Sequence, residues 1–200
     1  MTETTTRRSP LAMALLGLFW ESPMHAYRMQ QLIKERHKDS VVNVTQRNSI
    51  YQTIERLLRG GLIEVEATTR DEKRPERTIY KITPLGRRTL EGWLRTMIST
   101  PAREYPEFLA ALAFLPVLTP DKVGAALEQR VAALEDQLSS LLVELHHATT
   151  FLPRIFVLEG ECQVAVLRAE LDYVRTLTAD LRAGKLTWNS EELRKFAAKE

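Results

Sequence analysis

The chain contains very little cysteine: Cys162 is the only one among 200 residues. One thiol excludes an intramolecular disulfide framework and a zinc site made of cysteines, and we expect Cys162 to be a small buried apolar side chain. Long apolar runs are also missing. The longest, FLAALAFLPVL at 108–118, is too short and too broken by proline to span a bilayer, and the opening MTETTTRRSP lacks a signal-peptide apolar region. We therefore expect a soluble cytoplasmic protein without membrane contact.

Catalytic motifs are absent from the sequence as well. It has no glycine-rich phosphate loop and no serine elbow, and its acidic residues are scattered rather than paired. His146 and His147 are adjacent, so on a helix they diverge by about 100° and cannot share a metal as an i, i+4 pair would. We expect a protein that is not an enzyme and that has no cofactor and no metal site.

The charge is divided unevenly between the two halves. Residues 1–100 carry 17 Lys and Arg against 11 Asp and Glu, whereas residues 101–200 carry 11 against 15. The basic half is the one suited to face a polyanion, although many soluble domains are as lopsided. The hydrophobic content of 44% is enough for a core in one large domain or two small ones.

Three helices followed by two strands are predicted in the basic half. Apolar residues at 10–20 indicate a first helix, and we expect Trp20 at its end to lie in the hydrophobic core. Residues 25–38 indicate a second helix. A third is expected from an N-cap at Thr45 to Arg59, ended by Gly60-Gly61. Alternation at 62–68 and 78–83 predicts two strands around a charged loop, and Pro84 starts a further helix. This order is that of a winged helix-turn-helix.

The third helix has an apolar stripe and a polar row. The stripe is Ile50, Ile54, Leu57 and Leu58, and the row is Gln46, Ser49, Thr53 and Arg56, with Arg47 and Gln52 beside it. Gln and Arg suit bidentate contacts with base edges, and such a helix fits the major groove. The alternative is a plain solvated helix face.

Other candidate DNA contacts flank this helix. The hairpin loop carries Arg70, Lys73, Arg74 and Arg77, which suit phosphates or the minor groove, although nearby acids leave it weakly positive. Tyr51 can pack in the core or contact a phosphate. His25 and Tyr27 begin the second helix, where free N–H groups can bind an anion. Arg7 and Arg8 form a short basic arm, as compatible with disorder as with function.

The acidic half predicts two long amphipathic helices with heptad seams. The first seam comprises Leu127, Val131, Leu134, Leu138, Leu141 and Leu145, and the second comprises Val164, Leu167, Leu171, Val174, Thr178 and Leu181. Pro153 separates them and Gly184 ends the second. Such helices must bury their seams against each other or against a partner chain, and the pattern alone leaves both open.

Three ordered motifs resemble the PadR family of transcriptional regulators. They are SPMHAYRMQQLI, SIYQTIERLLRGGLIEVE and ERTIYKITPLGRRTL, within residues 10–95, with Ala26 and Ile54 departing from the usual Gly and Leu. The resemblance implies a mainly α fold: a winged helix-turn-helix domain with its connecting helix at 1–98, a linker with a short apolar helix at 99–118, and a helical dimerisation domain at 119–200.

The resemblance also implies a ligand-responsive repressor that acts as a homodimer on double-stranded DNA with a pseudo-palindromic operator. The dimerisation residues are then the apolar residues of the two seams, without Thr178, and a small-molecule effector is a possible further partner. Two other readings remain open: a winged helix used for protein contacts, and a small-molecule-binding protein that does not bind DNA.

Overall fold

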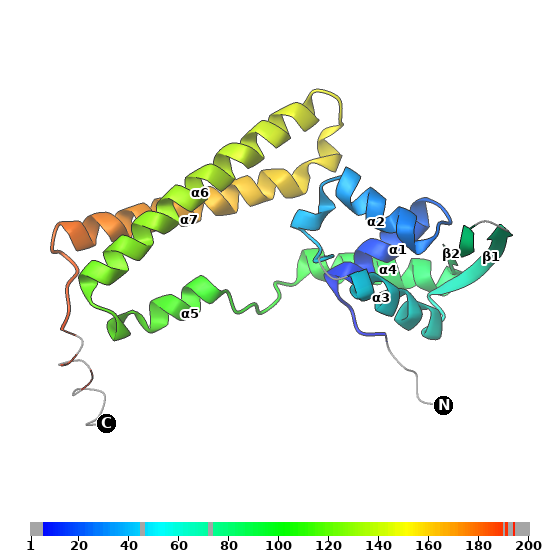
Figure 1. Ribbon diagram of the computed structural model, residues 1–200, viewed down its shortest axis with the longest axis horizontal. Helices are drawn as coiled ribbons and strands as arrows, with labels where there is room; N and C mark the ends of the chain where they lie inside the picture. The colour runs from blue at the N-terminus through cyan, green and yellow to red at the C-terminus, as the bar shows by residue number, and fades with distance from the viewer. Residues whose placement is uncertain (1–5, 45–46, 72–73, 190, 192–193, 195–200) are drawn as a thin grey trace. The chain divides into compact units, whose positions relative to one another are not determined.

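The computed structural model shows two compact units, Met1–Arg103 and Glu104–Glu200. It describes residues 6–44, 47–71, 74–189, 191 and 194, without the side chains of 47–48, 69–71 and 74–77. The first unit contains α1 (Pro10–Glu21), α2 (Ala26–Glu35), the 3-10 turn η1 (Lys38–Ser40), α3 (Arg47–Arg59), β1 (Ile63–Asp71), β2 (Arg74–Ile82) and α4 (Pro84–Ser99) (Figure 1). The second contains α5 (Glu107–Ala113), η2 (Leu115–Val117), α6 (Pro120–Thr149), η3 (Arg154–Phe156) and α7 (Leu158–Arg182). No helix within the described residues is long and apolar enough to cross a membrane.

Local chemistry explains where the helices of the first unit begin and end. The Ser9 hydroxyl accepts the Ala12 N–H at 3.1 Å ahead of Pro10, so α1 starts where the sequence predicts. Helix α3 ends at Arg59 as predicted, and Gly61 follows with φ 66°, a conformation that favours glycine. Helix α2 stops at Glu35, short of the predicted Lys38, because His37 takes a left-handed conformation and η1 follows.

The core of the first unit joins α1, α2, α3, the base of the hairpin and α4. Its most deeply buried side chains include Leu15, Phe19, Met29, Ile33 and Leu57. The prediction that Trp20 belongs to this core is wrong, since it is 60% exposed. One residue after Phe19, it is turned about 100° away from the buried face of α1.

The hairpin is longer than the sequence suggested. Strands β1 and β2 pair antiparallel from Ile63 opposite Ile82 out to Asp71 opposite Arg74, with irregularities between Val65 and Ala67 and between Thr69 and Asp71. Only residues 72–73 separate the strands, so the predicted long loop over 69–77 is wrong. Met24 lies outside both strands and exchanges two backbone hydrogen bonds, of 3.0 and 3.1 Å, with Tyr80 of β2. This bridge links the start of α2 to the wing.

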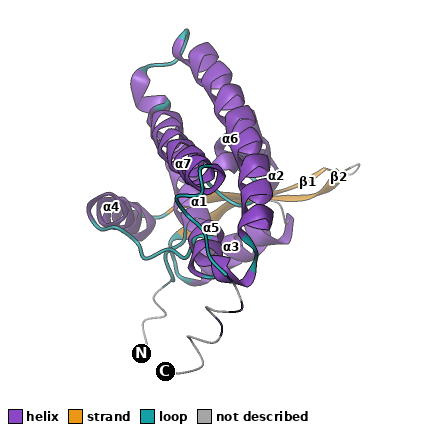
Figure 2. Cartoon of the chain, turned by 90° about the vertical axis from the view of Figure 1, so that its left-hand side faces the viewer, coloured by secondary structure: helices purple, strands orange, loops and turns teal. Residues whose placement is uncertain are grey.

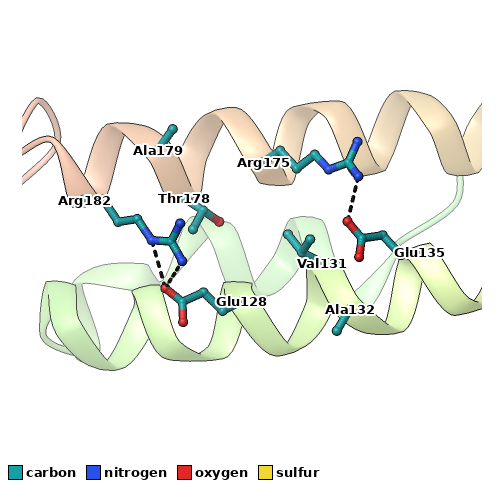
Figure 3. Close-up of a pocket in the computed structure, with 8 residues that line it drawn as sticks. All are labelled: Glu128, Val131, Ala132, Glu135, Arg175, Thr178, Ala179 and Arg182. Carbon is teal, nitrogen blue, oxygen red and sulfur yellow. Dashed lines mark hydrogen bonds and ion pairs between the residues drawn. The ribbon is translucent and has the colours of Figure 1, made fainter.

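Helices α6 and α7 of the second unit form an antiparallel pair, and their seams close on each other within one chain. Ion pairs fix the register on both sides: Arg130 pairs with Glu170, and Glu135 and Glu128 pair with Arg175 and Arg182 at 2.6 and 2.7 Å (Figure 3). Each step of seven residues on α6 matches a step of seven on α7, as in an antiparallel coiled coil.

This pairing buries part of both predicted seams within the single chain. Leu127, Leu134, Val164, Leu171, Val174 and Thr178 are buried in the single chain. The remaining predicted seam residues are half-buried; these are Val131, Leu138, Leu141, Leu145, Leu167 and Leu181.

Two further burial predictions are wrong. Cys162 is exposed on α7, next to Glu161 and outside the seam. Leu58 is 38% exposed on α3, because it follows the buried Leu57 by one residue and is turned away from the core.

Candidate nucleic-acid interface

Helix α3 divides into a buried and an exposed face. Ile50, Thr53, Ile54 and Leu57 are each at most 5% exposed. Tyr51, Gln52, Glu55, Leu58 and Arg59 are exposed. The helix is therefore held by one face in the core of the first unit and presents a polar face with an aromatic flank to solvent.

The predicted polar row is not the exposed one. Thr53 is buried, which contradicts its assignment as a DNA contact. It lies three residues after Ile50 and four before Leu57, so it shares their face of the helix. Ser49 and Arg56 on the same flank are half-buried.

The exposed face is turned from the predicted row by roughly a quarter of the helix circumference. Gln52, Glu55 and Arg59 recur at intervals of three and four residues and form its centre. Gln52 has the amide that can donate to and accept from an adenine edge, and Glu55 can accept from cytosine. Sequence reasoning missed Glu55 and Arg59. Counting positions opposite the stripe Ile50–Ile54–Leu57 would have found both.

The start of α2 is organised by His25. Its Nδ1 accepts the Arg28 N–H at 3.0 Å and caps the helix, and its ring lies 6.3 Å from that of Tyr27 at an interplanar angle of 26°. The cap occupies one of the N–H groups that an anion would use. His25 therefore positions this end of the helix, whereas Tyr27, 57% exposed, is the residue able to reach outward.

Ion pairs fix the other end of α2. Arg36 donates to Glu21 at the end of α1 at 2.7 Å, and this hydrogen bond raises the pKa of Arg36 above its usual value. Arg28 pairs with Glu35 within the helix at 3.0 Å. These arginines are paired with carboxylates of their own unit.

The remaining predicted contacts lie on or near the wing and at the start of α3. Arg70 belongs to β1, and Arg74 and Arg77 belong to β2, which together extend beyond the helices of the first unit (Figure 2). The side chains of these three residues and of Arg47 lie outside the described part of the structure, as do Lys73, Gln46 and the predicted cap Thr45. At the base of the wing, Lys81 pairs with Glu64 at 3.3 Å.

A three-helix core whose third helix exposes a polar face, followed by a two-stranded wing bridged to the start of the second helix, defines a winged helix-turn-helix protein. Residues 15–92, which lie within the winged-helix unit, match the transcriptional regulator PadR-like family. The family consists of transcriptional regulators rather than enzymes.

Solved structures share the fold over most of the chain. Bacillus subtilis PadR in complex with operator DNA is 19% identical, covering 86% of this chain and 98% of that chain with a TM-score of 0.70. The same protein in complex with p-coumaric acid is 17% identical, covering 87% and 99%, TM-score 0.68. The Vibrio cholerae virulence activator AphA is 16% identical, covering 86% and 98%, TM-score 0.64. No curated protein matches the sequence.

Proposed function

We propose that this chain is a transcriptional regulator that binds double-stranded DNA by placing the exposed face of α3 in the major groove. The observation that carries the proposal is the combination of a PadR-like winged-helix unit with a polar α3 face centred on Gln52. A helix presented on one rigid face can read base edges while its other face stays in the core.

Within this proposal, Gln52 contacts bases and Tyr51 contacts an adjacent phosphate through its hydroxyl. Gln46 and Arg47, at the leading end of the helix, are also proposed to contact bases. The wing residues Arg70, Lys73, Arg74 and Arg77 are proposed to follow the backbone or the minor groove.

The test is binding to genomic fragments, followed by titration of the selected duplex. Gln52→Ala should cost about 1–3 kcal/mol, or roughly five- to 150-fold in affinity, if the amide makes a bidentate base contact. Gln137→Ala, an exposed glutamine on α6, is the matched control and should bind as wild type. Wild-type affinity in Gln52→Ala would refute the assignment of the reading face. A wild-type protein without salt-dependent affinity for any duplex would favour a protein-interaction module.

We further propose that the protein acts as a homodimer through outer surfaces of the second unit. Val143 on α6, Phe151 and Ile155 in the connection to α7, and Val166 on α7 are each at least 60% exposed. Such apolar exposure is typical of association surfaces, and a twofold dimer would present two copies of α3 to a pseudo-palindrome. Sedimentation of wild type and of a Phe151→Ser, Ile155→Ser variant tests this. A wild-type protein that sediments as a monomer at micromolar concentration would refute it.

The resemblance to PadR supports a repressor that responds to a small molecule. The first unit has an open groove of about 570 Å³ between α1, α2 and α4, lined mainly by apolar residues such as Met13, Trp20 and Leu94, with Arg87 and Glu91 among its charged residues. Mostly apolar cavities of this size with a few polar groups suit drug-sized ligands. An aromatic acid such as p-coumaric acid, present in one of the PadR structures, is the probe we would use.

The fluorescence of Trp20 reports on this groove once the other tryptophans are removed. In a Trp93→Phe, Trp188→Phe protein, p-coumaric acid should change the Trp20 emission and shift the DNA titration. Unchanged emission at millimolar acid would refute this ligand class. AphA is called an activator, so the direction of regulation needs a reporter assay: a repressor lowers transcription from its own operator, and an activator raises it.

A further inference from the structure

The segment that precedes α1 is seated on the end of α3. A Cβ added at Gly60 would lie 2.2 Å from the Thr6 hydroxyl oxygen, so the segment rests directly on this glycine. Three residues further on, the Ser9 hydroxyl accepts a long hydrogen bond of 3.4 Å from Arg56 Nη2. We call Thr6–Ser9 the arm. The arm is thus tied to α3 at two points one helical turn apart.

Four arginines lie at the C-terminal end of α3, two on the arm and two on the helix itself. Arg7 and Arg8 are exposed on the arm, Arg59 is exposed at the last position of the helix, and Arg56 is half-buried beside Ser9. Six arginines elsewhere, Arg28, Arg36, Arg130, Arg154, Arg175 and Arg182, are paired with carboxylates. None of the four has an ion-pair partner among the described residues, and Arg56 Nε is buried without a hydrogen-bond acceptor there. This end of α3 therefore has unneutralised positive charge.

The length of α3 places this charge at the edge of a groove. Thirteen residues span about 20 Å, whereas the major groove is about 12 Å wide. A helix that enters with its N-terminal residues foremost leaves its C-terminal end beside the sugar-phosphate backbone. That end is the negative pole of the helix dipole and by itself repels phosphate. Guanidinium groups at this end of α3 supply the positive charge and the hydrogen-bond donors that bind a phosphate.

We propose that the arm is a second DNA-contacting element, in which Arg7 and Arg8, together with Arg59, bind phosphates bordering the major groove that α3 occupies. The inference rests on the proposed DNA-binding function. The arm is held in place before DNA arrives, because Thr6 on Gly60 and Ser9 on Arg56 fix its path. It contacts phosphates only, so it adds affinity without sequence preference.

The salt dependence of binding to a random-sequence duplex tests the proposal. Losing two phosphate contacts per protomer in an Arg7→Ala, Arg8→Ala protein should reduce the slope of log K against log salt by about 1.8 for each bound protomer, and affinity at 0.15 M salt by up to about 30-fold for each bound protomer. The control is Arg95→Ala, Arg168→Ala, which removes the same charge from exposed positions on α4 and α7. Its slope should stay at the wild-type value.

Each other result counts against a specific claim. A wild-type slope in the arm variant overturns the inference and leaves the proposed function intact. Equal losses in the arm variant and the control overturn it as well, because net charge would then explain both. A wild-type protein that binds no duplex overturns the proposed function itself.

A second variant tests the seat of the arm without changing any charge. In Gly60→Leu the new side chain occupies the position of Thr6, so the slope should fall toward that of the arm variant while the helical circular dichroism stays at the wild-type value. A Gly60→Leu protein with both the wild-type slope and the wild-type dichroism would overturn the claim that this contact positions the arm.

Discussion

Replacing Gly86 by alanine tests how α4 is attached to the turn that ends α3. A Cβ at this position would lie 2.0 Å from the Leu62 carbonyl oxygen and 2.8 Å from Ile82 Cγ1. The same junction contains a small hydrogen-bond network. Thr83 Oγ1 accepts the Gly86 N–H at 3.0 Å and donates to the Gly61 carbonyl at 2.7 Å, while the Thr83 N–H donates to Leu62 at 3.0 Å. A methyl group added at Gly86 must therefore push the backbone of α4 away from the backbone of Leu62.

The magnitude follows from three contributions. Overpacking costs about 1–3 kcal/mol, and loss of the bond between Thr83 and Leu62 costs about 0.5–1.5 kcal/mol. Alanine regains up to about 1 kcal/mol of helix propensity. We expect a net loss of about 2 kcal/mol in the free energy of unfolding, which corresponds to a fall of about 8–16 °C in the Tm of a unit of this size.

Gly92→Ala is the matched control. It lies on the same helix with no atom within 4 Å of the position that the new methyl group would take, so it should raise Tm by a few degrees through propensity alone. Thermal unfolding of both variants is followed by far-ultraviolet circular dichroism, which reports on helix content. If Gly86→Ala melts at or above the wild-type temperature, the close approach to Leu62 does not constrain this junction, and the reasoning is refuted.

Three further predictions concern other parts of the chain. Leu57→Ala removes a fully buried side chain of α3 and should cost about 2–5 kcal/mol in urea unfolding, and a loss under about 1 kcal/mol would contradict its place in the core. His25→Ala should cost about 0.5–2 kcal/mol through loss of the α2 cap, with His25→Asn as the capping control. The hydrogen bond from Arg154 lowers the pKa of Glu161, so the ion pair is present above the ordinary value of 4.5 and is lost as pH falls through the lowered pKa. A carboxyl NMR titration should give a midpoint below 4.5, which moves back toward it in Arg154→Gln.

The element plan of the first unit could be predicted because its signals are local. Pro10 after Ser9, and Gly61 after Arg59, set helix ends through the conformations that these residues allow. The hairpin tip depends on pairing across the strands, so residues 69–71 and 74–77 resemble a charged loop in the sequence although β1 and β2 continue through them. The Met24 bridge to Tyr80 is a single non-local contact without a sequence pattern.

The exposed face of α3 differs from the polar row that the sequence predicts. Thr53 is polar, so it was grouped with Ser49 and Arg56, yet its spacing from Ile50 and Leu57 puts it in their stripe. The polarity of Thr53 suggested a solvent-exposed position, whereas its spacing along the helix indicates a buried one. Periodicity prevailed because the hydroxyl of a threonine is tolerated at a helix surface packed against a neighbour, whereas the helix cannot rotate without exposing Ile50 and Leu57.

The seams of α6 and α7 show where charge pattern and chain connectivity act together. Acidic residues seven apart on α6 and arginines seven apart on α7 specify an antiparallel register, but two chains could form the same pairs by exchanging helices. The connection decides between these arrangements: residues 150–157 contain η3 and are long enough to reverse the chain. A short link keeps the second helix at an effective concentration on the order of millimolar, well above any ordinary protein concentration. The seams therefore close within one chain, and the proposed dimer would be built from the apolar side chains that this closure leaves outside.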